Sequence, residues 1–255
     1  MAKVSDLRER RTAAQMHALA AVRREISSND SASQSKYLRD FQHAFQQYDA
    51  ELTAEQLNQR LVSADVLLIG DYHALPASQR FAGNTVEALA QKRPVVLGIE
   101  AVLSRDQHIL EAWWRREISE ETLRRRLRFD GEWGYDWDPF YGLLVAAREN
   151  AEGIYGLDCM PRNDLRRIRS RDRHAAAKIR EMRHLHPGAA LLVLFGESHM
   201  APQHLPALLK KAMPEERLLT VLQNLDSIYW AATQAGAPAV TVEADTLCVD
   251  RKSVV

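Results

Sequence analysis

The segment VLLIGDYH, Val66 to His73, decides the fold class. Its opening residues form a short apolar run, which is typical of a strand buried on both faces. Gly70 permits a sharp exit from that strand, and the chain then presents a carboxylate, a phenol and an imidazole. A buried strand that ends in ionisable groups is typical of an α/β protein, whose ligands bind at the carboxyl edge of a parallel sheet.

Short apolar runs of this kind alternate with helical patterns from residue 65 onward. This alternation predicts an α/β fold with a mostly parallel sheet and helices on both faces. Asp138 and Pro139 predict the start of one helix, with Asp138 as its cap. The expected strands are Val66–Ile69, Val95–Ile99, Gly153–Leu157, Leu191–Phe195, Leu218–Leu222 and Leu247–Val249.

The first 60 residues differ from the rest, because they are rich in charges and helix formers. We expect helices over residues 5–27 and 34–49 and a third helix capped by Thr53. The predicted organisation is therefore an N-terminal helical extension over residues 1–60 and an α/β domain over residues 61–255.

Composition excludes several classes of protein. The 255 residues carry 34 Lys and Arg against 34 Asp and Glu, so no net charge attracts nucleic acid or anionic lipid. No apolar run reaches the roughly 18 residues of a membrane span, and the start lacks the apolar region of a signal peptide. Only two cysteines occur, which favours a reducing compartment. We expect a cytoplasmic protein with a small-molecule or peptide ligand, no nucleic-acid or membrane partner, and a homodimer left open.

Polar side chains follow several of the expected strands, and two strand ends share the pattern Gly-x-x-His. The carboxyl ends of parallel strands meet at one edge, so we expect His73, Glu100 and His199 to converge. Two imidazoles and a carboxylate suit a metal ion with an open position or a general base. The groups after the strands are Gly70-Asp71-Tyr72-His73, Glu100, Asp158-Cys159, Gly196-Glu197-Ser198-His199 and Asn224.

Two further segments leave alternatives open. The aromatic segment Trp133–Tyr141 could wall a ligand pocket or anchor a loop on the core. Residues 162–186 carry nine Lys or Arg, and an amphipathic helix with a solvated basic face is favoured over a phosphate or nucleic-acid site. Asp172 lies on the inward stripe of that helix, where a carboxylate needs a partner or a wet cavity.

The ordered set GDYH, VVLGIE and GESH resembles the ChaN-like domain of the Tiki superfamily, over roughly residues 60–250. That superfamily also includes TraB-type proteins and erythromycin esterases. Additional similarity lies in QHILEAWWRREIS, WGYDWDPFYGLLVAARE and RSRDRHAAAKI. Because the chain has no lipid-acceptor Cys near its start, we do not expect the surface haem lipoprotein that is typical of the ChaN branch. It stops at DRKSVV, so we expect a truncated or replaced last helix relative to the family.

The resemblance implies two functions. One branch contains metal-dependent esterase- or peptidase-like hydrolases, which makes His73, Glu100 and His199 the catalytic and metal-binding set. The other branch binds haem, which makes Tyr72, His73 and His199 candidate iron ligands. We expect metal-dependent hydrolysis of an ester or amide, with haem or iron-chelate binding as the alternative, so the cofactor is a divalent metal ion or haem. The supporting residues are Asp71, Glu197, Arg171 and Asp172.

Overall fold

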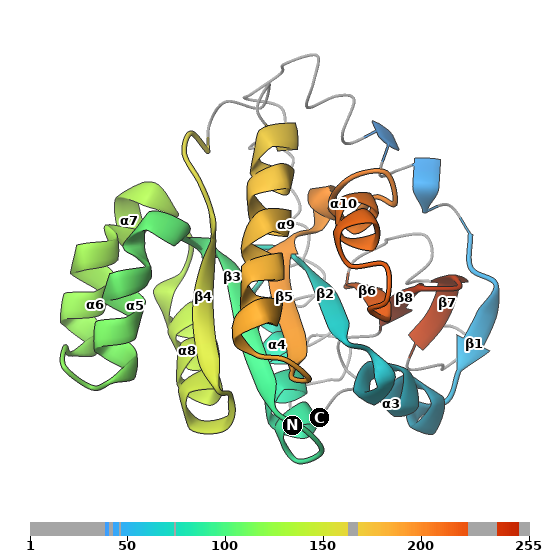
Figure 1. Ribbon diagram of the computed structural model, residues 1–255, viewed down its shortest axis with the longest axis horizontal. Coiled ribbons are helices and arrows are strands. Elements are labelled where there is room, and N and C mark those ends of the chain that lie inside the picture. Colours follow the sequence, from blue (N-terminus) through green and yellow to red (C-terminus); the bar gives the residue numbers. More distant parts are fainter. Residues whose placement is uncertain are drawn as a thin grey trace, which may run out of the picture.

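The computed structural model describes residues 39–40, 43–45, 47–73, 75–162, 168–223 and 239–249. In these ranges one sheet of eight strands runs in the order β1-β7-β8-β6-β2-β5-β3-β4 (Figure 1). The helices expected at 5–27 and over much of 34–49, and Asn224, lie outside the described residues. The strands are β1 Ala50–Leu52, β2 Val66–Asp71, β3 Val95–Leu103, β4 Gly153–Asp158, β5 Ala190–Gly196, β6 Leu218–Leu222, β7 Ala239–Glu243 and β8 Thr246–Val249.

The sheet is mostly parallel, which confirms the predicted α/β fold class. All six expected strands are present, and the pairs β8-β6, β6-β2, β2-β5, β5-β3 and β3-β4 are parallel. The sequence prediction missed β7 and β1, which extend the sheet antiparallel beyond β8. β1 has only three residues and two of them are exposed, so it has no apolar run to reveal it.

Helices cover both faces of the sheet. In the view of Figure 1, α9 and α10 lie in front of the strands and α4 and α8 lie behind them, while α5, α6 and α7 gather beside β4. The helices are α3 Ala54–Ser63, α4 Pro76–Ala90, α5 Gln107–Trp114, α6 Glu120–Leu127, α7 Phe129–Glu132, α8 Trp137–Asn150, α9 Ile168–Leu185 and α10 Leu205–Ala212. Two short 3-10 turns, η1 Ser104–Asp106 and η3 Glu197–Met200, follow β3 and β5.

The two faces of the sheet form two separate cores because side chains alternate along each strand. Leu67 and Ile69 of β2 pack in the core that contains α4 and α8. Val66 and Leu68 pack in the core that contains α9 and α10. Each fully buried apolar side chain of this kind stabilises the fold by roughly 1.5–3 kcal/mol. The continuous apolar run of β2 is therefore explained by burial on both faces.

Of two helix caps predicted from the sequence, the structure confirms one and contradicts the other. Thr53 caps α3 in a capping box with Gln56, as expected. The prediction that Asp138 caps α8 is wrong: Asp136 is the cap, and its Oδ1 accepts a hydrogen bond from the Asp138 amide at 3.3 Å. Pro139 then lies within the first turn, where amide hydrogens have no intrahelical partner, so the ring is tolerated.

The basic segment forms α9, and its inward stripe is buried as expected. Leu165 lies outside the described residues, but Ala175, Ile179 and Met182 pack in the core. Because β1 pairs with β7, residues 50–52 belong to the sheet, and the division of the chain at residue 60 stays a prediction. None of the described helices is long and apolar enough to cross a bilayer.

Candidate active site

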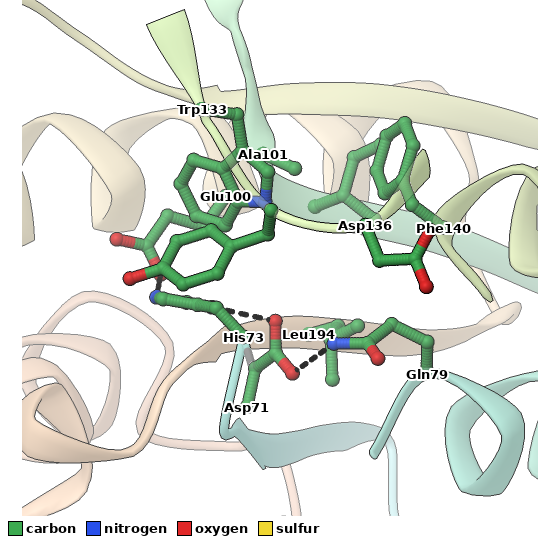
Figure 2. Close-up of a pocket in the computed structure, with 11 residues that line it drawn as sticks. Asp71, His73, Gln79, Glu100, Ala101, Trp133, Asp136, Phe140 and Leu194 are labelled. Carbon is green, nitrogen blue, oxygen red and sulfur yellow. Dashed lines mark hydrogen bonds and ion pairs between the residues drawn. The ribbon is translucent and has the colours of Figure 1, made fainter. Parts of the chain in front are cut away.

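The carboxyl ends of β2, β5 and β3 bring the predicted residues together. β5 pairs with β2 on one side and with β3 on the other, with Asp71 opposite Gly196 and Ile99 opposite Leu194. His73 follows β2, Glu100 lies in β3, and His199 lies in η3 directly after β5. His73 and Glu100 line one pocket at this edge (Figure 2). Topology therefore unites three residues that are far apart in the sequence.

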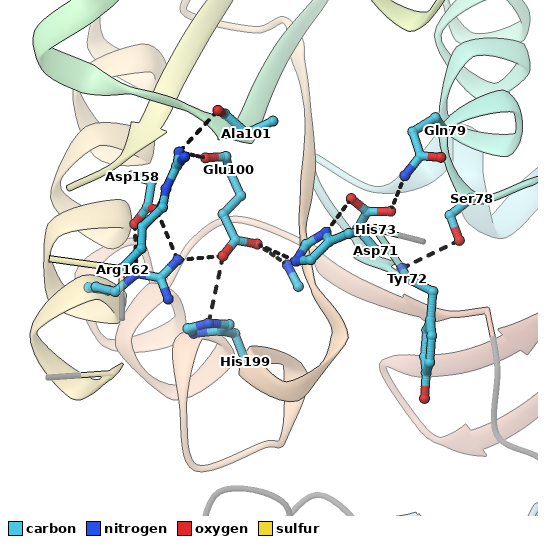
Figure 3. A network of polar contacts seen from close by, with 12 residues as sticks. Asp71, Tyr72, His73, Ser78, Gln79, Glu100, Ala101, Asp158, Arg162 and His199 are labelled. Atoms are coloured by element: carbon cyan, nitrogen blue, oxygen red, sulfur yellow. Dashed lines mark hydrogen bonds and ion pairs between the residues drawn. The ribbon is translucent and has the colours of Figure 1, made fainter. Parts of the chain in front are cut away.

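Glu100 lies between the two imidazoles. Its Oε2 is 3.7 Å from Nε2 of His73, and its Oε1 is 3.9 Å from Nε2 of His199 (Figure 3). The side chain of His73 is 21% exposed and that of His199 is 5% exposed. Of the two rings, His73 is therefore the one that meets solvent and the pocket.

Each imidazole is also held by a carboxylate through its other nitrogen. Nδ1 of His73 lies 2.7 Å from Oδ2 of Asp71, and Nδ1 of His199 lies 2.5 Å from Oδ1 of Asp172. A carboxylate accepts from Nδ1–H, which leaves Nε2 of a neutral ring as the basic atom. Asp172, the acid predicted on the inward stripe of α9, thus has its partner at the site.

Both carboxylate oxygens of Glu100 already accept strong hydrogen bonds. Nη2 of Arg171 donates to Oε1 at 2.5 Å, and the Gly196 amide donates to Oε2 at 2.5 Å. Burial alone raises the pKa of Glu100, but its electrostatic interactions with His73, Arg171 and His199 and the hydrogen bond from the Gly196 amide hold it at about 2. Glu100 is therefore a fixed negative charge between the imidazoles.

The two glycines of the Gly-x-x-His motifs are needed for close packing. A Cβ on Gly196 would lie 3.0 Å from Oε2 of Glu100 and 3.3 Å from Nε2 of His73. A Cβ on Gly70 would lie 2.8 Å from Cγ of Glu197. Neither glycine has a positive φ. The expectation that Gly70 serves a sharp turn is therefore replaced by a requirement for space beside a side chain.

Two residues hold the site together from the buried side, and the sequence analysis assigned no role to either of them. Asp158, at the end of β4, accepts from Nε of Arg171 at 2.8 Å and from Nε of Arg162 at 2.7 Å. Arg162 also donates to the carbonyls of Glu100 and Ala101 at 2.9 and 3.0 Å. The only signal was that Asp158 follows a strand.

The supporting residue Arg171 is buried between two acids, as its position on α9 requires. Burial alone would lower the pKa of Arg171, but the carboxylates of Glu100 and Asp158 raise it above its ordinary value. Its permanent charge compensates the cluster of acids, which could not otherwise ionise together in a buried position.

Glu197 lies in η3, two residues before His199. Its Oε1 accepts from the Gln223 amide at 2.8 Å, beyond the end of β6, and its stem packs beside Gly70. It therefore connects the ends of β2, β5 and β6, which is a positioning role.

The aromatic segment Trp133–Tyr141 has both of the roles that the sequence left open: it lines the pocket and it is anchored on the core. Trp133 and Tyr135 stand against His73, with ring centroids 4.4 and 5.2 Å away, and both line the pocket. Trp137 is buried and packs on Phe129, so that part of the segment anchors it to the core. The enclosed part of the pocket is small, with room for roughly one water molecule.

The comparisons with known proteins bear on this geometry. The model of the family described as haem-binding uptake, Tiki superfamily, ChaN matches residues 57–190, more than half of the 255 residues. The chain belongs to this family. No curated protein matches the sequence.

Several solved structures share the fold of this ChaN-family protein. ChaN of Campylobacter jejuni, which binds haem cofacially, has a TM-score of 0.53 at 15% identity over 79% of this chain and 93% of its own. The type III effector HopBA1 has 0.54 at 13%, over 76% and 91%. RRSP, a MARTX toxin effector domain from Vibrio vulnificus, has 0.52 at 18%, over 90% of this chain but only 46% of its own. Identities this low establish the shared fold alone.

The residues fit a divalent metal ion poorly. Both oxygens of Glu100 are engaged at 2.5 Å, and one of their donors is the Arg171 cation, which opposes a second positive charge beside it. Within the described ranges, no three or more His, Cys, Asp or Glu side chains are arranged to hold a metal ion. The expected metal site at His73, Glu100 and His199 is therefore not assigned.

The residues fit haem in part. Nδ1 of His73 is held by Asp71, as in most iron- or zinc-bound histidines, and its ring is partly exposed. The Tyr72 ring, however, points away from His73, Glu100 and His199 (Figure 3). His199 is buried against Glu100. Of the three candidate iron ligands, only His73 is therefore both exposed and directed into the pocket.

Proposed function

We propose that this ChaN-family protein hydrolyses an ester or amide of a small molecule or peptide by acid–base catalysis at His73, Glu100 and His199. The observation that carries the proposal is the arrangement of the two imidazoles. Each is oriented by its own carboxylate, and both direct Nε2 at a Glu100 carboxylate that a buried Arg171 neutralises. Such carboxylate–imidazole pairs provide general bases with a fixed tautomer.

His73 is assigned the role of general base because it is the imidazole that lines the pocket. Its Nε2 takes a proton from water while the water oxygen forms a bond to the substrate carbonyl carbon. The positive charge that develops on His73 is stabilised by Asp71 at 2.7 Å and by Glu100 at 3.7 Å. When the bond to the leaving group breaks, His73 returns the proton to the leaving oxygen or nitrogen.

His199 and Glu100 stabilise that cycle from the buried side. His199 lies between Asp172 and Glu100 and packs edge-on against Phe195, with ring centroids 4.9 Å apart. Its Nε2 lies 3.9 Å from Oε1 of Glu100, away from bulk water. We assign it to positioning of Glu100, with Asp71 and Asp172 as the orienting carboxylates.

Haem binding is the second candidate, because the family is described as haem-binding and a ChaN shares the fold. His73 would ligate the iron through Nε2, with Asp71 behind it, and Trp133 beside it would contact the macrocycle. Haem would supply an iron centre for redox chemistry, or it would be the ligand that the protein transfers. Both candidates use His73. They differ in whether the purified protein contains haem, which one experiment can decide.

The experiment compares wild type with Tyr72→Phe. The hydrolysis proposal predicts that protein purified without added haem lacks a Soret band, cleaves a p-nitrophenyl ester, and retains its rate within about twofold in the variant, since the Tyr72 ring points away. A Soret band in wild type purified without added haem would favour haem, and the variant would keep it because His73 is the proposed ligand. A rate abolished by a chelator and restored by a divalent ion would instead favour the metal-dependent form of hydrolysis.

Two further expectations remain proposals beside this function. We infer a cytoplasmic protein that binds a small-molecule or peptide ligand and leave a homodimer open. Cell fractionation and light scattering test the location and the oligomeric state.

A further inference from the structure

The loop of residues 133–136, which joins α7 to α8, forms one wall of the pocket beside His73 (Figure 2). The ring centroids of Trp133 and Tyr135 lie 4.4 and 5.2 Å from that of His73 and 5.5 Å from each other. The space enclosed beside these rings has room for roughly one water molecule. The imidazole assigned as general base is therefore reached by water but not by an ester or amide in this conformation.

The other walls of the pocket belong to the sheet and to two long helices. Strands β2, β3 and β5 form its base, and each of them pairs with a neighbour on both sides. The helices α4 and α8 contribute Gln79 and Phe140, which are buried. Trp133 and Tyr135 are only half-buried and lie in no helix or strand. The wall that can be displaced at the lowest cost is therefore this loop.

Arg162 links the loop to the fixed part of the site. Its guanidinium carbon lies 4.8 Å from the centre of the Trp133 ring, and its Nη1 donates to the Glu132 carbonyl at 3.1 Å. The same guanidinium donates to Asp158 at 2.7 Å and to the Glu100 carbonyl at 2.9 Å. A cation over a partly exposed ring makes a weak contact that breaks and re-forms. Arg162 therefore holds the loop against the site without locking it.

Gly134 gives the loop its closed shape. Its φ is +78°, in the left-handed region that residues with a Cβ adopt only at a cost. Its amide donates to the Phe129 carbonyl at 3.1 Å. A Cβ at this position would have the Asp130 carbonyl oxygen as its nearest neighbour, at an ordinary contact distance of 3.8 Å. Replacing Gly134 by alanine would therefore strain the closed backbone without a steric clash.

We propose that the loop of residues 133–136 is a lid on His73. It opens to admit the substrate carbonyl, and it closes with Trp133 and Tyr135 against the imidazole so that bulk water is excluded. The inference deepens the proposed function and rests on it for the reaction, because it concerns access to the same imidazole. Exclusion of bulk water strengthens the interaction of His73 with its carboxylate partners. Arg162 is a positioning residue that returns the lid to the closed state.

The test measures how fast diethyl pyrocarbonate modifies His73 in the full chain, followed by mass spectrometry of the peptide that contains it. This reagent acylates an imidazole nitrogen and is larger than the one water that the closed pocket admits. His73 of the wild type should react at least about tenfold more slowly than His108, an exposed imidazole of α5, because the open state is a minor one. Equal rates at the two histidines would overturn the proposal.

Gly134→Ala is the decisive variant, because it disfavours the closed backbone and leaves every pocket side chain in place. It should speed the modification of His73 by about fivefold, with the rate at His108 unchanged. Gly131→Ala is the matched control: Gly131 lies in α7, has no positive φ and has no atom within 4 Å of its Cβ. It should leave both rates as in the wild type. A His73 rate that is unchanged in Gly134→Ala, or that rises equally in Gly131→Ala, would contradict the lid.

Trp133→Ala provides a second route to the same result. It removes the ring that lies nearest to His73 together with the contact to Arg162, so it should speed the modification of His73 at least as much as Gly134→Ala does. Melting temperatures above the assay temperature show that the rates belong to folded protein. A folded Trp133→Ala variant whose His73 stays protected would also contradict the lid.

Cleavage of p-nitrophenyl acetate by the same proteins separates this inference from the proposed function. Cleavage by the wild type, together with faster modification of His73 in Gly134→Ala, supports both. Faster modification without ester cleavage by any of the proteins leaves the lid standing and removes the hydrolase. Ester cleavage with equal modification of His73 in every variant leaves the hydrolase standing and removes the lid.

Discussion

Arg171 and Glu100 form a buried ion pair, with Nη2 of the guanidinium 2.5 Å from Oε1 of the carboxylate. Because their side chains are only 8% and 4% exposed, neither charge is solvated by bulk water. The pair satisfies Glu100 as an acceptor and keeps it negative between two imidazoles. This single contact explains why the site is suited to proton transfer by histidine and poorly suited to a bound divalent metal ion.

Replacing Asp172 by Asn should slow hydrolysis while leaving the pocket intact. An amide at this position can present NH₂ to Nδ1 of His199 and select the wrong tautomer, so we expect kcat to fall by about 10–100-fold with little change in KM. The measurement is steady-state kinetics of ester cleavage. A larger effect on KM than on kcat would show that Asp172 acts on substrate binding instead.

Acid should destabilise the protein through Glu100. Its folded-state pKa is lowered from 4.5 to about 2, so the unfolded chain binds a proton more readily. The resulting stabilisation is fully present above about pH 4.5 and is lost as the pH falls towards 2, an effect on the order of 3 kcal/mol. Urea unfolding at several pH values measures it.

Glu100→Gln provides the control for that measurement. It should remove this part of the pH dependence, lower stability by roughly 3–5 kcal/mol because Arg171 loses its buried partner, and reduce the hydrolysis rate of the folded fraction. An unchanged slope of stability against pH in the variant would mean that other carboxylates account for the acid sensitivity.

Gly196→Ala should damage the site more than the fold. The added methyl group would meet Oε2 of Glu100 at 3.0 Å and Nε2 of His73 at 3.3 Å, and so displace the two groups from each other. Gly142→Ala is the matched control, because no atom lies within 4 Å of its Cβ and it sits inside α8. That control should gain roughly 0.5–1 kcal/mol of stability and keep full activity. Equal activity in the two variants would refute the tight fit at Gly196.

Much of the fold was predictable because apolar runs and parallel pairing leave strong local signals. The strands that contain Val66 and Leu191 are buried on both faces, and their composition shows it. The approach of His73, Glu100 and His199 followed from the rule that parallel strands end at one edge. β1 gave no such signal, because it is short and mostly exposed.

The parts that could not be predicted depend on the paths of loops. Arg162 places its guanidinium 4.8 Å from the ring centre of Trp133 and also binds Asp158. No spacing rule connects those three positions in the sequence. The same holds for Asp136, whose role as cap and pocket wall depends on where α8 begins. Sequence patterns thus located the three candidate groups but not the loop residues that surround them.

The most direct test of acid–base hydrolysis is the kcat/KM for p-nitrophenyl acetate in the presence of EDTA, for wild type, His73→Ala and His108→Ala. His108 is an exposed residue of α5, so it controls for the background reactivity of surface imidazoles. The account predicts that wild type and His108→Ala hydrolyse the ester equally and that His73→Ala is slower by about 10²–10⁴-fold. A His73→Ala variant as active as wild type, or a wild type that EDTA inactivates, would contradict it.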